Sequence, residues 1–214
     1  MADDLPAMTT RAHNPHSTTD VLWYVLSRAD QAYPRTWLLK LLYLADCEAE
    51  QWLGHPITDM AYVFHHYGPF DDRVYTCLDE LESNGKVTLE NKSGATNRGE
   101  VWEGTYYRVK RKLRTSSLCD AERAVIDALM ERYRGRAASQ LTQDAYKTTP
   151  MTIAQKRGRG SKVEPKSGRN VERRRHAGLD VAAVLRAREQ AKRGEVFALA
   201  DVERELQRRS DRRR

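Results

Sequence analysis

The chain has 214 residues, of which 40% are apolar, enough for one sizeable domain with an appendage. Its net charge of +7 is uneven: residues 1–150 hold 18 Lys/Arg against 21 Asp/Glu, whereas residues 151–214 hold 19 against 9. No apolar run reaches the roughly 20 residues of a membrane span, and no secretory signal is recognised. Three widely spaced cysteines argue against a disulfide framework or a cysteine-based zinc site, so a reducing, cytoplasmic setting is expected.

The first predicted elements are two helices that follow a disordered leader at residues 1–16. Ser17-Thr-Thr-Asp20 supplies N-cap chemistry for the first helix, which has apolar residues at helical spacing. The second helix is expected from about Arg35 to Leu53, because its leucines and alanines form one stripe. Gly54 ends this helix, and the proline at position 56 prevents it from resuming.

An aromatic segment at residues 61–67 is interpreted as extended or strand-like. Gly68-Pro69 is expected to end it and to start a third helix, because proline at the first helical position loses no needed N–H. Asp71 and Asp72 would then lie in the first helical turn, where carboxylates favour the positive end of the helix dipole. Gly85 would close this helix.

A β-hairpin and two further helices are predicted in the second half of the domain. Residues 86–90 and 105–110 alternate with period two, and the polar loop at residues 91–99 would join them. Helices are expected at about 120–134 and 137–146. The predicted fold class is therefore mainly α with a small β-hairpin, an α+β fold.

The chain divides by composition into four predicted parts. A leader at residues 1–16 precedes a compact helical domain at residues 17–150. Residues 151–178 are nearly all Lys, Arg, Gly, Ser, Pro and Asn, and we interpret them as a flexible basic linker. Residues 179–214 would form a basic tail with short C-terminal helices that need a surface to dock on.

No catalytic, cofactor or metal motif emerges from the sequence. His65 and His66 are adjacent, so in an extended segment they face opposite sides and cannot readily share one metal. No nucleophile elbow, phosphate-binding loop or dinucleotide fingerprint occurs. The prediction is therefore a protein without enzymatic activity, cofactor or metal. The aromatics near Gly68-Pro69 are explained first as core, although tyrosine is also enriched at protein interfaces.

Two segments carry a resemblance to a known family. Lys40-Leu-Leu-Tyr-Leu on the second helix, followed by Tyr67-Gly-Pro-Phe and Tyr75, resembles the Panacea (SocA-like) antitoxin domain of bacteria and phages over roughly residues 18–150. The resemblance implies a mainly helical domain that binds and neutralises a toxin encoded nearby, by stoichiometric association. Cys119 departs from the usual capping hydroxyl, and the basic tail is not part of the domain.

The resemblance also implies which residues contact the toxin. In the domain, the expected contact residues are Lys40, Tyr43, Tyr67, Gly68, Pro69, Phe70 and Tyr75. The last element of the tail separately resembles the C-terminal toxin-binding helices of other antitoxins, so the tail is expected to fold on the toxin and to bury Val202 and Leu206 there. The sequence leaves open the toxin's identity, the mode of neutralisation and the oligomeric state.

An alternative function is DNA binding. A helix at about residues 70–84 followed by a hairpin with a basic strand matches a winged-helix arrangement, but its acidic residues, among them Asp79 and Glu82, oppose phosphate. The tail could attract phosphate without sequence preference. The candidate tail residues are Arg173, Arg174, Arg175, Arg208 and Arg209.

Overall fold

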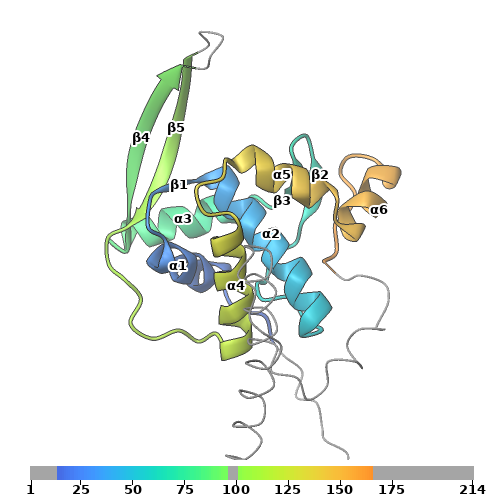
Figure 1. Ribbon diagram of the computed structural model, residues 1–214, viewed down its shortest axis with the longest axis horizontal. Helices are drawn as coiled ribbons and strands as arrows, with labels where there is room; N and C mark the ends of the chain where they lie inside the picture. The colour runs from blue at the N-terminus through green and yellow to red at the C-terminus, as the bar shows by residue number, and fades with distance from the viewer. Residues whose placement is uncertain (1–13, 96–100, 166–214) are drawn as a thin grey trace, which may run out of the picture.

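The structure, a computed structural model, describes residues 14–95 and 101–165 (Figure 1). Its helices are α1 (Thr18–Arg28), α2 (Arg35–Trp52), α3 (Arg73–Ser83), α4 (Asp120–Arg132), α5 (Ala138–Tyr146) and α6 (Thr149–Arg157). Its strands are β1 (Tyr33–Pro34), β2 (Val63–His65), β3 (Gly68–Phe70), β4 (Val87–Ala95) and β5 (Val101–Val109). The predicted fold class, mainly α with a small amount of β, is confirmed.

The core is built around α2, which contacts α3, α4 and α5. Leu38, Leu41 and Leu42 on this helix are all completely buried. A helix that is apolar over most of its circumference must be covered on several sides, and the other helices provide that cover. The predicted second helix, with its leucine stripe, is therefore the central element of the fold.

The main sheet has three antiparallel strands in the order β1-β5-β4. Tyr33 of β1 is opposite Tyr107, and Val87 of β4 is opposite Val109. In Figure 1 the β4–β5 hairpin projects away from the helices as a long arm. Both strands extend beyond the predicted segments, because polar residues at the far end of an arm give no apolar alternation to detect.

The Gly68-Pro69 segment corrects one prediction. Gly68, Pro69 and Phe70 form β3, which pairs antiparallel with β2, and the third helix begins only at Arg73. Gly68 has a φ of +89°, a conformation that glycine adopts without strain. Proline fits equally well into a short strand or a first helical turn, so its presence alone did not distinguish the two.

Asp71 also has a role other than the predicted one. It precedes α3 and is 5% exposed. Its carboxylate accepts hydrogen bonds from the Ala61 backbone N–H at 2.6 Å and from the Arg73 backbone N–H at 3.0 Å. The residue therefore ties the start of α3 to the segment before β2, rather than only favouring a helix dipole.

The predicted flexible linker is wrong for residues 151–165. Residues 149–157 form α6, and Met151, Ala154 and Val163 are at most 2% exposed. The Val163 N–H donates to the Tyr62 carbonyl at 2.8 Å. Composition predicted disorder here because it averages over the segment, whereas a few well-placed apolar residues are sufficient to dock it.

The predicted leader also joins the fold at its end. The His16 backbone N–H donates to the Ile57 carbonyl at 2.8 Å, and the His16 carbonyl accepts from the Asp59 N–H at 3.2 Å. Residues 1–13 of the leader lie outside the described residues. The rest of the linker, the tail and the hairpin tip at residues 96–100 also lie outside them.

Candidate functional site

A groove of about 760 Å³ lies between α2, the β2–β3 hairpin, the start of α3 and α5. It brings together five of the residues that the resemblance singled out. These lining residues are Lys40, Tyr67, Gly68, Phe70 and Tyr75. The two sequence segments of the resemblance therefore form one surface of the folded chain.

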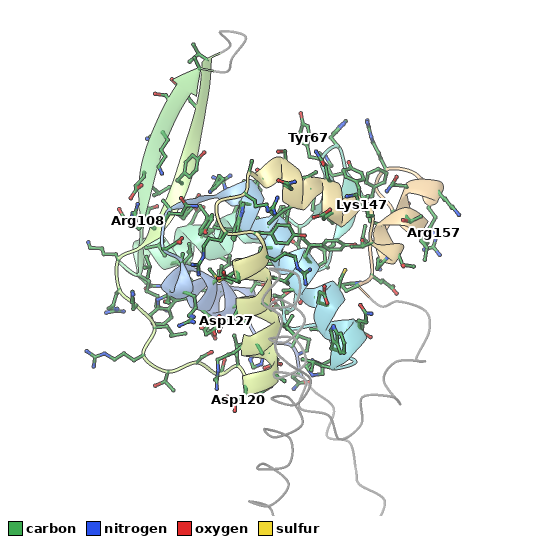
Figure 2. All side chains as sticks on the ribbon, in the orientation of Figure 1. Tyr67, Arg108, Asp120, Asp127, Lys147 and Arg157 are labelled. Atoms are coloured by element: carbon green, nitrogen blue, oxygen red, sulfur yellow. The ribbon has the colours of Figure 1, made fainter. Side chains whose placement is uncertain are left out.

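Exposed aromatic side chains border the groove. Tyr67 is 77% exposed at the turn between β2 and β3, and Figure 2 shows it projecting from this hairpin. Tyr75 on α3 is 37% exposed, and its ring centroid lies 6.0 Å from that of Phe70. Exposed tyrosines combine a large apolar ring with a polar tip, the property that makes them frequent at protein interfaces.

Arg35, at the first position of α2, lines the groove beside Tyr75. Its guanidinium carbon lies 4.0 Å from the centre of the Tyr75 ring, a cation–π contact. One Nη2–H donates to the Tyr107 hydroxyl at 3.1 Å. Sequence reasoning missed Arg35, because an arginine at a helix start gives no signal of the aromatic rings that fold against it.

Lys40 also lines the groove, although it is only 1% exposed. Its Nζ donates a hydrogen bond to the Pro69 carbonyl at 2.5 Å. Burial disfavours the ammonium and lowers the pKa of Lys40 to about 8. Lys40 thus connects α2 to β3 and places a buried amine at the groove.

Two of the expected contact residues do not line the groove. Pro69 is buried, and Tyr43 is completely buried with its hydroxyl 2.6 Å from the Thr148 Oγ1. Both residues therefore belong to the buried part of the fold rather than to the groove surface. Val202, Leu206 and the tail arginines at 173–175 and 208–209 lie outside the described residues.

A buried carboxylate holds the segment that leads from α2 toward β2. Asp46 is completely buried and accepts hydrogen bonds from two backbone N–H groups, of Ile57 and Thr58, both at 2.8 Å. The hydroxyls of Thr58 and Tyr62 donate to its other oxygen at 2.5 and 2.7 Å. Desolvation outweighs these bonds and raises the pKa of Asp46 to about 6. No pattern in the sequence indicated this role for Asp46.

The arrangement of α3 and the β4–β5 hairpin bears on the DNA-binding alternative. β1 lies between α1 and α2 and pairs with β5, and the hairpin follows α3, as in winged-helix proteins. The exposed side of α3 carries Asp79 and Glu82. On β5, Arg108 is paired with Glu90. The topology therefore matches a winged helix, while the charge on the helix opposes phosphate.

Within residues 14–95 and 101–165, no group of three or more His, Cys, Asp or Glu side chains is placed to hold a metal ion. Cys47, Cys77 and Cys119 are all free thiols. None of the helices described in the structure is both long and apolar enough to cross a membrane.

Comparison with protein families gives a match that contains all the residues lining the groove except Arg35 and Thr36. Residues 38–150 match the model of the family described as "Antitoxin SocA-like, Panacea domain". This range starts within α2, ends at the beginning of α6, and covers more than half of the chain. No curated protein and no solved structure matches the chain.

Proposed function

The protein belongs to the family of SocA-like antitoxins with a Panacea domain, and from this membership we propose that it binds and neutralises a toxin protein. Neutralisation is by stoichiometric association in the cytoplasm, without catalysis, and the toxin is encoded nearby. The groove between α2, the β2–β3 hairpin, α3 and α5 is the contact surface. Its partner contacts are made by Tyr67, Phe70 and Tyr75.

The observation that carries this proposal is the position of Tyr67. Tyr67 is 77% exposed, and it stands beside a groove large enough to receive side chains, a setting in which an exposed tyrosine is well placed to contact a partner. Lys40, which is buried at the groove, donates to the Pro69 carbonyl and thereby holds the hairpin that presents Tyr67. A surface held by a rigid scaffold is well suited to recognition.

The test is a growth rescue combined with co-purification. The neighbouring gene is expressed under tight control with the wild-type chain, Tyr67→Ala or Val101→Ala. Val101 is the matched control, because it is also 77% exposed but lies on β5. Rescue by wild type and by Val101→Ala, and loss of rescue with Tyr67→Ala, would support the proposal. A harmless neighbour that does not co-purify would contradict it.

The tail is proposed as a second contact, through Val202 and Leu206. This part of the proposal rests on the sequence. Its test is a chain ended after Pro165, because ending it after Pro150 would also remove buried residues of α6. Toxin affinity that is unchanged in the shortened chain would assign binding to the groove alone.

DNA binding is the second candidate, favoured by the winged-helix strand order β1-β5-β4. The acidic side of α3 makes the tail arginines, Arg173, Arg174, Arg175, Arg208 and Arg209, the better candidates for phosphate contact. Binding to duplex DNA at several salt concentrations, with the full chain and the chain ended after Pro165, tests this. Salt-dependent binding that needs the tail would support it, whereas no binding by either chain would exclude it.

A further inference from the structure

The groove has an unusual balance of charge. Arg35 and Lys40 both line it, whereas none of its lining residues is Asp or Glu. No salt bridge connects either cation to a carboxylate within the described residues. Two positive charges thus face one surface without an anion to balance them.

Lys40 has more hydrogen-bond donors than the fold uses. An ammonium carries three N–H groups, and the Pro69 carbonyl is the acceptor that the fold provides. The pKa of about 8 leaves the group mostly charged at neutral pH. A charged amine that is 1% exposed gains most from an anionic acceptor brought by a ligand, because a buried charge without a counter-ion is costly.

Arg35 also has a hydrogen-bond donor that the fold does not use. Its Nη2 donates to the Tyr107 hydroxyl, but its Nε is buried and has no hydrogen-bond partner. The planar guanidinium presents its donors as a fork that matches the two oxygens of a carboxylate. Its stacking on Tyr75 fixes the plane of the fork at the groove.

Two helix N-termini add to the positive potential. The first residues of α2 and of α5 line the groove, through Thr36 and through Ala138 and Ser139. Neither helix has a side-chain cap or an acidic residue in its first turn. Each therefore has backbone N–H groups without an intrahelical acceptor and the uncompensated positive end of its dipole.

These features converge on one ligand chemistry. We propose that the groove recognises the carboxylate of an Asp or Glu side chain, carried by an apolar segment of the toxin. Arg35 and Lys40 bind the carboxylate, while Tyr67, Phe70 and Tyr75 pack against its apolar neighbours. The groove is far larger than a carboxylate and is lined mainly by apolar surface, so the ligand must bring apolar groups as well. The inference rests on the proposed function, which makes the partner a protein.

The test is a double-mutant cycle on the complex with the cognate toxin. Affinity is measured by calorimetry for the full-length wild type, Arg35→Gln, Lys40→Met and Arg28→Gln, each against wild-type toxin and against toxins with single acidic residues changed to amides. Arg28 is the control, because it is a half-exposed cation paired with Asp127 outside the groove. Thermal melting of each variant checks its fold, and Arg35→Gln, at the partly exposed start of α2, carries the test if Lys40→Met does not fold.

The expected result is a loss of roughly 30-fold in affinity for Arg35→Gln, as for one partner of a buried ion pair. One acidic residue of the toxin should show the same loss, and the two losses should not add. Arg28→Gln should bind as wild type does.

Other outcomes overturn the inference in distinguishable ways. If Arg35→Gln and a folded Lys40→Met bind as wild type does while Tyr67→Ala does not, the proposed function stands and the carboxylate contact is wrong. If Arg35→Gln loses affinity equally for every amide variant of the toxin, the groove binds without an acidic side chain. If the wild-type chain binds no neighbouring gene product, the proposed function fails and this inference fails with it.

Discussion

The Lys40 Nζ and the Pro69 carbonyl oxygen are joined by a hydrogen bond of 2.5 Å. The two residues are 29 positions apart in the chain and belong to the two segments that carry the family resemblance. The bond joins the two segments in the fold, because a lysine on the central helix holds the strand that follows Tyr67.

The first prediction concerns the pH dependence that Lys40 gives to folding. Its pKa is about 8 in the folded chain and about 10.5 when unfolded, so the folded state releases this proton first. The protonated Lys40 therefore lowers the free energy of unfolding at neutral pH, and this loss should be relieved as pH rises from about 8 to 10.5. The free energy of unfolding should increase over this range by about 3 kcal/mol more in wild type than in Lys40→Met. Urea unfolding across this range measures the difference. Parallel curves for the two proteins would contradict the prediction.

Asp46 should make the free energy of unfolding depend on pH at lower pH values than Lys40 does. Its pKa is about 6 in the folded chain against 3.8 when exposed, so between these values the folded state holds the extra proton. The stability should therefore fall as pH rises from about 4 to 6, by on the order of 3 kcal/mol. Asp46→Asn keeps one acceptor for the backbone N–H groups of Ile57 and Thr58 and should lack this decline. If the variant declines equally, another group is responsible.

Substitutions at Tyr43 and Tyr67 should distinguish a residue that stabilises the fold from a residue that contacts the toxin. Tyr43→Phe removes the hydroxyl that bonds Thr148 and should lower the free energy of unfolding by about 1 kcal/mol. Toxin affinity should change little, because Tyr43 does not line the groove. Tyr67→Ala should do the reverse: its stability is kept and its affinity falls. Chemical unfolding and calorimetry measure the two quantities, and a loss of affinity in Tyr43→Phe without loss of stability would reverse the assignment.

The fourth prediction concerns α6. Ending the chain after Pro150 removes Met151, Ala154 and Val163, all at most 2% exposed. The lost apolar burial should destabilise the domain by on the order of 4 kcal/mol relative to a chain ended after Pro165. Urea unfolding of the two shortened chains tests this. Equal free energies would mean that α6 contributes nothing to the fold.

Much of the fold was predictable because local signals and tertiary packing agree. The apolar stripe of α2 and the stop at Gly54 defined the central helix, and α1, α4 and α5 followed the same logic. The predictions that were wrong are those for segments whose local sequence signal was ambiguous. Gly68-Pro69 fits a turn into a strand as well as a helix start, and α6 is short, polar and held by only a few buried side chains.

The candidate site was predictable only where it was contiguous in sequence. The segments around Lys40 and Tyr67 were identified through the family resemblance, which the family match confirms. The α5 residues were missed, because they reach the groove through tertiary packing across about a hundred positions, and Arg35 was missed because its ring partners come from α3 and β5. A single sequence does not report such distances.

The attachment of residues 161–163 to β2 has a consequence for any partner of the tail. Val163 bonds Tyr62, and Val63 forms a bridge with Lys162. His65, which lines the groove, is two residues along the same strand, or roughly 7 Å at the rise of a β-strand. The described part of the chain therefore ends, at Pro165, two residues after a segment that is held close to the groove. A toxin held at the groove would meet the tail at a high effective concentration, so that two weak attachments could act together as one slowly dissociating complex.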